Sequence, residues 1–407
     1  MKKLVALLLT LVLCLSCLPV MAEDTLDLSN VKLGVILLHN EDSTYDLNFI
    51  KGVEAAVANL GLTEDQVSMV RDIDESQECT ETALDLVDDG CNVIFANSFG
   101  HGSFLLEAAK QHPEVEFCHA TGTDAHVVVD EVPNFHNAFA AIYEGRYLAG
   151  VAAGMKLNEI KAAGKLKGEV PLMGYVGAYT YAEVISGYTS FYLGAKSVCP
   201  DVQMKVWFTG SWYDENEERA AAKALIAAGC DLISQHADSM GAPTACEDAG
   251  IPNISYNGST VESCENTFIV ASRIDWTPYF EYIIKQVAAG EKIDTDWTGT
   301  IKTGSVVLTE VNEKAAAEGT VAELAKLKAE FEAGTLKVFD TAKEGFITVG
   351  GKALDETWKP GTGTDGAFVE GTKIVYDGYF HESEYRSAPY FDAWIDGIEL
   401  LNTAFGD

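Results

Sequence analysis

The regular alternation of short apolar segments with amphipathic helices constrains this chain more than any other feature of its sequence. The clearest unit is residues 205–239, which read KVWFTGSWYDENEERAAAKALIAAGCDLISQHADS. A strand at 206–208 leads into a turn, and a helix follows with its apolar residues spaced as on one buried face. A second strand then spans residues 231–235. Strands that alternate with helices through short turns predict an α/β fold with doubly wound, mostly parallel sheets.

The alternation runs through the chain twice, which predicts two lobes of similar design. Residues 31–38 form a near-continuous apolar run, as expected for a strand buried on both faces of a parallel sheet. The pattern begins again at residues 172–176. Two such lobes joined by several chain crossings predict a periplasmic-binding-protein type I fold that closes on a ligand by a hinge. The predicted units are lobe 1 (31–141 plus 272–292), lobe 2 (142–271 plus 300–340) and a C-terminal extension packed on the lobes (341–407).

The amino terminus reads as an export signal. Two lysines precede an apolar run at residues 4–13, and small residues end at Ala22. We therefore expect residues 1–22 to be removed and the mature protein to lie outside the cytoplasm. The alternative is a lipoprotein modified at Cys17, which we weigh below simple cleavage because the position three before it is Cys14 rather than an aliphatic residue.

Charge and cysteine content exclude several classes of function. The formal net charge of −34, with 28 Lys and Arg, argues against binding to nucleic acid or to anionic membranes. Seven cysteines follow residue 22, an odd number that favours buried single thiols over a disulfide framework. Cys246 and Cys264 are the first pair to check. The eight histidines show no metal-ligand spacing, so we expect no metal site and no cofactor.

Trp212 is the strongest single candidate for ligand contact. It lies on the loop after a strand, at the sheet edge where open α/β folds bind ligands. An exposed indole there offers a platform to a flat or π-rich molecule. The alternative is a lid residue packed over its own helix. Phe99 and Asp238 occupy equivalent loops after other strands, with a place in the core and a helix cap as their respective alternatives.

Several segments resemble the basic membrane protein (PnrA-like) family, the substrate-binding lipoproteins of purine ABC transporters. Thr-Gly-Ser-Trp-Tyr-Asp at residues 209–214 resembles the family's "tGs(W/F)xD" segment. NSFGHGSFLLEAAKQHPEVEF (97–117) is similar to "sfG…A…PdvkF", and YEGRYLAGVAAG (143–154) is similar to "eeasYLAGvaA". Gly194-Ala195-Lys196 with Pro200 is similar to "GAk…nP". The resemblance covers roughly residues 31–340, with several independent segments in the same order.

The resemblance implies a purine base held between two aromatic side chains, which fall here on Tyr45 and Trp212. Family members that bind nucleosides hold the ribose with an aspartate and a lysine. Those positions read Asn257 and approximately Asp275 here. The neighbouring Trp276 could fill the space of a sugar, or it could pack beneath the hinge. The resemblance therefore implies a purine nucleobase, with a nucleoside as the alternative ligand.

We expect a receptor without enzymatic activity that delivers a purine to a membrane ABC permease, and we expect it to be a monomer. Two alternatives stay open: a sugar or autoinducer receptor of the same fold, and a secreted nucleosidase or hydrolase. The hydrolase motif GxSxG and the aspartate cluster of a nucleosidase are absent. The predicted ligand-binding residues are Tyr45, Asp46, Phe99, Trp212, Asp238, Asn257, Asp275 and Trp276.

Overall fold

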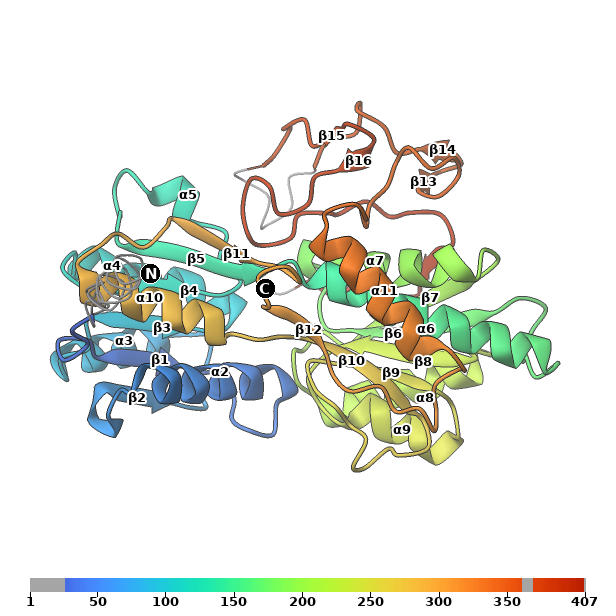
Figure 1. Ribbon diagram of the computed structural model, residues 1–407, viewed down its shortest axis with the longest axis horizontal. Coiled ribbons are helices and arrows are strands. Elements are labelled where there is room, and N and C mark those ends of the chain that lie inside the picture. Colours follow the sequence, from blue (N-terminus) through green and yellow to red (C-terminus); the bar gives the residue numbers. More distant parts are fainter. Residues whose placement is uncertain (1–25, 361–368, 406–407) are drawn as a thin grey trace, which may run out of the picture.

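The computed structural model describes residues 26–360 and 369–405, so the predicted signal peptide and Cys17 lie outside the described residues. Two α/β lobes lie side by side, and a third, smaller body of chain covers one face of the second lobe (Figure 1). Each lobe has a sheet between layers of helices. The predicted α/β class with mostly parallel sheets is confirmed.

Lobe 1 contains a six-stranded sheet in the order β11-β5-β4-β3-β1-β2, with every pair parallel. Its strands are β1 (Leu33–Ile36), β2 (Val67–Val70), β3 (Val93–Ala96), β4 (Glu116–His119), β5 (Phe135–Ala140) and β11 (Asp296–Gly299). Its helices are α2 (Thr44–Leu60), α3 (Gln77–Asp88), α4 (Gly102–Gln111), α5 (Ala125–Val128) and α10 (Thr277–Ala289), with 3-10 turns η1 (Glu64–Gln66) and η2 (Phe99–His101).

Lobe 2 contains a seven-stranded sheet in the order β12-β10-β9-β8-β6-β7-β17, in which only the β10–β12 pair is antiparallel. Its strands are β6 (Leu172–Gly177), β7 (Gln203–Phe208), β8 (Leu232–His236), β9 (Asn253–Tyr256), β10 (Phe268–Ile274), β12 (Val306–Leu308) and β17 (Ile398–Leu400). Its helices are α6 (Ile142–Ala162), α7 (Ala182–Val198), α8 (Glu215–Ala227), α9 (Gly241–Ala249) and α11 (Thr320–Glu332).

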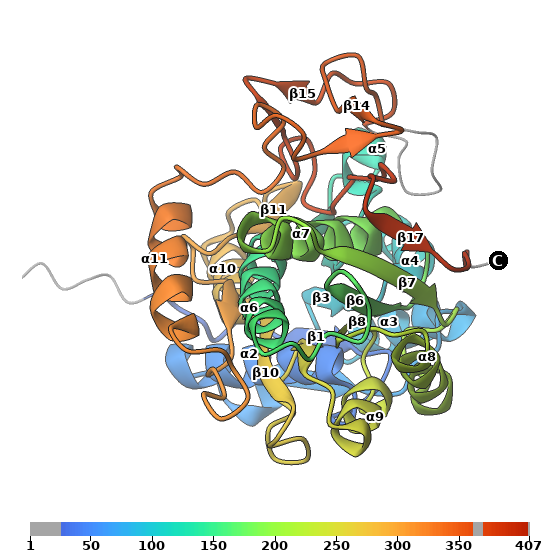
Figure 2. The same ribbon diagram turned by 90° about the vertical axis from the view of Figure 1, so that its right-hand side faces the viewer.

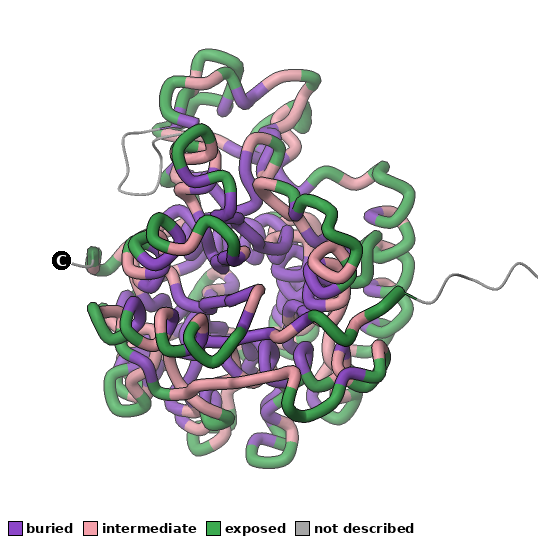
Figure 3. Tube along the Cα trace, turned by 90° about the vertical axis from the view of Figure 1, so that its left-hand side faces the viewer, coloured by how far each residue is buried: buried purple, intermediate pink, exposed green. Residues whose placement is uncertain are grey.

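Three segments cross between the lobes: β5 to α6, β10 to α10, and β11 to β12. Because β10 runs to Ile274 within the second sheet, the chain returns to lobe 1 at α10 rather than at residue 272. Buried apolar strands form the centre of each lobe, while exposed residues gather on the outer helices and loops (Figure 3). The described part of the chain contains no helix long and apolar enough to cross a membrane.

Two glycines allow α6 and α7 to pack in direct contact, as Figure 2 shows. A Cβ added to Gly150 would lie 1.9 Å from the carbonyl oxygen of Phe191, and one added to Gly194 would lie 2.0 Å from that of Tyr147. No side chain fits in either place, so both positions require glycine. This backbone contact explains the Tyr-Leu-Ala-Gly motif at 147–150 in structural terms.

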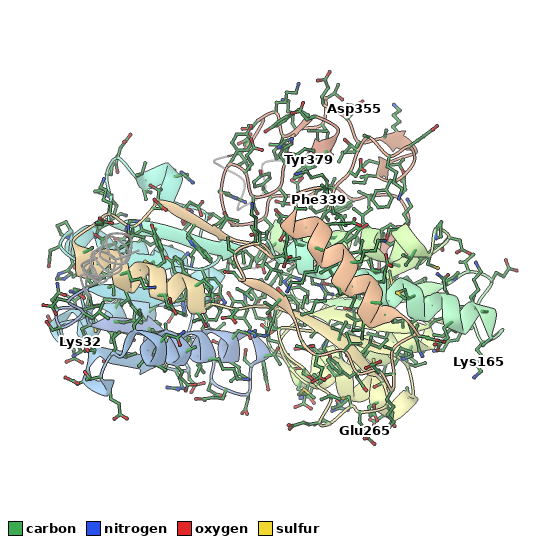
Figure 4. The ribbon with its side chains drawn as sticks, in the orientation of Figure 1. Lys32, Lys165, Glu265, Phe339, Asp355 and Tyr379 are labelled. Carbon is green, nitrogen blue, oxygen red and sulfur yellow. The ribbon has the colours of Figure 1, made fainter. Side chains whose placement is uncertain are left out.

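The chain after α11 forms a small aromatic body on lobe 2, with Phe339 at its base and Tyr379 further out (Figure 4). Phe339 and Phe391 stack with ring centroids 4.5 Å apart. Two short hairpins belong to it, β13 (Thr348–Val349) with β14 (Lys352–Ala353) and β15 (Val375–Tyr376) with β16 (Tyr379–Phe380). The chain then returns to the main sheet as β17. All seven described cysteines are buried free thiols, so Cys246 and Cys264 are not paired.

Candidate functional site

A narrow cleft lies between the two lobes at the carboxyl ends of strands from both sheets. It holds about 380 Å³ of empty space, part of it open to solvent. Five of the eight predicted site residues line it: Tyr45, Asp46, Phe99, Trp212 and Asp238. Its other lining residues are Leu38, His39, Ser98, Thr121, Glu183, His236 and Tyr256.

On the lobe 1 side, Asp46 fixes the loop between β1 and α2. Its Oδ1 accepts hydrogen bonds from the backbone N–H of His39 (3.1 Å) and from Nδ2 of Asn97 (2.6 Å). Its Oδ2 accepts one from the hydroxyl of Ser43 (2.6 Å), whose Oγ in turn caps α2 by accepting from the backbone N–H of Asp46. Both carboxylate oxygens are therefore engaged within the protein, and Asp46 shapes the wall of the cleft.

The aromatic groups of the lobe 1 wall are Tyr45 and Phe99. The Tyr45 hydroxyl donates to the backbone carbonyl of Asn97 (2.8 Å), and its ring packs edge-on against Phe49. Phe99 begins the 3-10 turn after β3 and lies 5.1 Å from the ring of Tyr181 in lobe 2. These contacts hold two rings on the lobe 1 wall, and that of Phe99 lies directly against the opposite lobe.

The lobe 2 wall is an aromatic cluster formed by Trp212, Tyr179 and Tyr181. Trp212 meets Tyr179 edge-on at 5.1 Å between centroids, and Tyr179 stacks on Tyr181 with 19° between the ring planes. Trp212 comes from the loop after β7, and the two tyrosines come from the loop after β6. Side chains of a neighbouring loop thus contact the indole of Trp212.

Asp238 joins the lobes and carries a perturbed carboxyl group. Its carbonyl oxygen accepts from the backbone N–H and the hydroxyl of Thr44, at 3.1 and 3.2 Å, and Asn257 donates to its Oδ1 at 3.3 Å. Burial raises the pKa of the Asp238 carboxyl well above its usual value, and the nearby carboxylates of Glu218 and Asp46 raise it further. An uncharged Asp238 can donate a hydrogen bond, and an ionised one can only accept.

Glu183 and His236 form a second polar pair at the base of the cleft. Nε2 of His236 lies 3.1 Å from Oε1 of Glu183, and its ring packs 4.2 Å from that of Tyr256. Burial lowers the pKa of His236, and the bond to Glu183 opposes that shift. Among the described residues that line this cleft, none is a lysine or an arginine.

A buried arginine packs against Tyr256, one of the residues that line the cleft. Arg146 on α6 is inaccessible to solvent, and its Nη2 donates to the hydroxyls of Ser234 (2.7 Å) and Tyr175 (3.1 Å). Its guanidinium also lies 5.3 Å from the ring of Tyr256, which lines the cleft. Arg146 therefore supplies positive charge behind the acidic site without reaching the ligand space.

Three predicted site residues do not line the cleft. Trp276 is 1% exposed and stacks on Phe49 at 4.3 Å, in the core where α2 and α10 pack together. Asp275 lies just before α10, where its Oδ1 accepts from the backbone N–H of Thr277 (3.0 Å). Asn257 is buried with a positive φ of 60°; its side chain donates to Asp238, and its carbonyl accepts from Asn48 of lobe 1. The expectation that Trp276 fills a sugar site is therefore wrong, because its ring packs inside lobe 1.

The residues that sequence reasoning missed share one signal. Thr121 lies just after β4, His236 and Tyr256 end β8 and β9, and Glu183 opens α7 after the loop that carries the two tyrosines. Thr121, His236 and Tyr256 lie at the carboxyl ends of strands that the alternation had located, and Glu183 follows the loop after another such strand. The same edge rule that selected Trp212 applies to them.

Comparison with known proteins places the chain in a family. The family described as "ABC transporter substrate-binding protein PnrA-like" matches residues 35–337. A purine-binding protein of Brucella abortus is 32% identical over 298 residues, covering 72% of this chain and 79% of that protein. A putative ABC transporter glucose-binding protein of Haloferax volcanii is 33% identical over 220 residues, covering 54% of this chain and 52% of that protein.

A solved structure supports the fold. An ABC transporter solute-binding protein from Conexibacter woesei superposes with a TM-score of 0.59 at 19% identity, covering 75% of this chain and 98% of that one. This likeness confirms the predicted periplasmic-binding-protein type I fold. The chain belongs to the PnrA-like family of ABC transporter substrate-binding proteins.

Proposed function

We propose that this protein binds a purine nucleobase in the inter-lobe cleft and presents it to a membrane ABC permease. The observation that carries the proposal is the pairing of an aromatic wall around Trp212 with hydrogen-bonding carboxyl groups at Asp238 and Glu183. A flat heterocycle can stack on the indole while its edge meets these carboxyl groups. Base–aromatic stacking contributes roughly 1–3 kcal/mol per ring.

The charged and polar groups of the cleft limit which class of ligand can bind there. Purine bases carry ring and exocyclic N–H groups, which a carboxylate accepts, and acceptor nitrogens, which a protonated carboxyl can serve. Asp238 can take either role because burial raises its pKa. No lysine or arginine is among the described residues that line the cleft, so a phosphate would meet the acidic groups without a cationic side chain in contact with it. We therefore expect nucleotides to be rejected.

The cellular role follows from the family and from the amino-terminal sequence. Substrate-binding proteins of ABC transporters work with a membrane permease, and an export signal over residues 1–22 would deliver the chain to the outer side of that membrane. We propose cleavage after Ala22 and a monomeric receptor that releases its ligand chemically unchanged.

Two measurements test this function. Mass spectrometry of small molecules released from the purified, denatured protein should detect a purine base. Calorimetric titration with adenine, guanine, hypoxanthine, glucose and AMP should then show binding of at least one base and none of AMP. Glucose as the bound or released molecule would favour the activity named for the relative from Haloferax volcanii and would contradict the purine proposal. Conversion of an added nucleoside to base and sugar would instead support a nucleosidase.

We expect a free base to bind at least about tenfold more tightly than its riboside, a difference of about 1.4 kcal/mol. The positions that by resemblance correspond to the family's ribose-holding aspartate and lysine read Asn257 and approximately Asp275 here, and neither residue lines the cleft. Titration of hypoxanthine against inosine and of adenine against adenosine measures the difference. A riboside that binds tenfold more tightly than its base would mean that other groups hold the sugar.

A further inference from the structure

The last described segment of the chain, residues 398–404, lies beside the aromatic wall of the cleft. β17 adds to the edge of the second sheet by parallel pairing with β7, with Leu400 opposite Val206. The family match ends at residue 337, so this strand belongs to the extension rather than to the matched region. The pairing continues past the strand, because the backbone N–H of Leu401 donates to the carbonyl of Val206 at 2.9 Å.

Asn402 then holds the end of β7 with its side chain. Its Oδ1 accepts from the backbone N–H of Phe208, and its Nδ2 donates to the carbonyl of the same residue, both at 2.8 Å. The side-chain amide of Asn402 thus makes the pair of hydrogen bonds to Phe208 that a backbone partner in a β-ladder would make. Phe208 is the last residue of β7, four positions before Trp212. Asn402 therefore fixes the point from which the Trp212 loop starts.

Ala404 holds the neighbouring loop. The backbone N–H of Thr180 donates to the carbonyl of Ala404 (2.6 Å), and the backbone N–H of Ala404 donates to Oγ1 of Thr180 (2.9 Å). Thr180 is buried and stands between Tyr179 and Tyr181, the two rings that support Trp212. Residues 398–404 thus form hydrogen bonds to both of the loops that make up the lobe 2 wall.

We infer that residues 398–404 are a positioning element for ligand binding, which pre-orients Trp212, Tyr179 and Tyr181 before the ligand arrives. The inference rests on the proposed binding of a purine at this wall. Pre-orientation increases affinity because less side-chain and loop freedom is lost when the complex forms. Asn402 and Thr180 act through the aromatic side chains and do not themselves line the cleft.

The test compares two variants that break these bonds with two matched controls. Asn402→Ala removes both bonds to Phe208, and Thr180→Val removes the hydroxyl acceptor at nearly constant volume. Thr180→Ser keeps that acceptor. Glu399→Gln breaks the exposed ion pair between Glu399 and Lys205 on the same strand pair, which should contribute little.

Two readouts are measured on each full-length variant: calorimetric affinity for hypoxanthine, adenine and guanine, and acrylamide quenching of the Trp212 fluorescence of the ligand-free protein. The Trp212 signal is the difference from a matching Trp212→Phe background. We expect Asn402→Ala and Thr180→Val to bind the base about 5- to 10-fold more weakly and to expose Trp212 to quencher. Both controls should stay within twofold of wild type.

The outcomes separate this inference from the proposed function. If wild type binds none of the three bases, the purine proposal fails, and the quenching difference alone decides whether the segment orders the wall. Unchanged quenching in both test variants would overturn the inference, whether or not their melting temperatures fall. Unchanged affinity in both would overturn it for ligand binding.

Discussion

Replacing Trp212 by alanine is expected to weaken binding of a purine base by about 5- to 150-fold, which corresponds to the roughly 1–3 kcal/mol that one stacked ring contributes. The indole lines the cleft from lobe 2, and Tyr45 lines it from lobe 1. A base between them would lose one of its two aromatic faces. Calorimetric titration of wild type and variant with the same base measures the loss.

Graded substitutions distinguish stacking from general packing. Trp212→Phe keeps a ring and should retain most of the affinity, whereas Trp212→Leu should recover part of it through apolar contact alone. Trp207→Ala is the matched control, since Trp207 lies on β7, is 37% exposed and does not line the cleft. Ligand should also change the fluorescence of Trp212, a signal that the alanine variant lacks.

A different result would mean that the ligand binds elsewhere than against Trp212. If Trp212 only supported its neighbours Tyr179 and Tyr181, the alanine variant would melt at a lower temperature and its affinity would barely change. Affinity within twofold of wild type, with the ligand-induced fluorescence change intact, would contradict stacking at Trp212. The role of Tyr45 as the opposite face would then fall with it.

The strands of the fold and the sheet edge that carries the site could both be predicted from the sequence, and for the same physical reason. Buried parallel strands require continuous apolar runs, and the loops that follow them must converge at one sheet edge. Tyr45, Phe99, Trp212 and Asp238 were chosen by that rule or by family resemblance, and all four line the cleft. The rule depends only on local order along the chain.

The direction of the Trp276 side chain could not be predicted from the neighbouring sequence. Its sequence position, directly after a strand, is equivalent to that of a cleft residue. Its ring instead turns into lobe 1, where it stacks on Phe49 from α2. Gly52 lies against the same tryptophan, since a Cβ there would fall 2.7 Å from that of Trp276. The direction of a side chain at a lobe crossing depends on such long-range partners, and no pattern near residue 276 reveals them.

The C-terminal return strand is a second case. Residues 398–400 form only three positions of β17, too few for an apolar alternation to stand out. Their partner β7 lies nearly 200 positions earlier, as the Phe208–Asn402 bonds illustrate with a separation of 194. Pairing of this kind is set by the free edge of the finished sheet. It therefore becomes visible only once the whole lobe is assembled.

Glu218 is a buried acid for which we expect a large pH effect on stability. It is inaccessible to solvent on α8, and its Oε1 accepts from the backbone N–H groups of Asp214 (3.3 Å) and Ser239 (3.2 Å). It thus joins the turn after Trp212 to the turn after Asp238. Its other oxygen, Oε2, has no hydrogen-bond partner in the part of the chain that the structure describes. Burial raises the pKa of Glu218 from 4.5 to about 7, against the opposing effect of these hydrogen bonds.

The sign of the effect follows from this raised pKa. Between pH 4.5 and 7 the unfolded chain releases a proton that folded Glu218 retains, so rising pH lowers the free energy of unfolding, and the loss is complete above pH 7. Glu218→Gln keeps the Oε1 acceptor and carries no charge. Relative to wild type, we expect the variant to gain about 3 kcal/mol of unfolding free energy from pH 4.5 to 8, at about 1.4 kcal/mol per pKa unit.

Urea unfolding of wild type and Glu218→Gln at several pH values measures this gain. The quantity compared is the change with pH in the difference between their free energies of unfolding. The other acidic groups of the chain are the same in both proteins and largely cancel, apart from Asp238, whose raised pKa depends partly on the charge of Glu218. Loss of that charge relieves the repulsion and shifts the variant in the same direction. The control Glu217→Gln removes a carboxylate from the exposed face of α8 and should show no such gain. A constant difference between Glu218→Gln and wild type from pH 4.5 to 8 would mean that Glu218 is charged in the folded protein, and its buried negative charge would then act on the Asp238 carboxyl of the cleft.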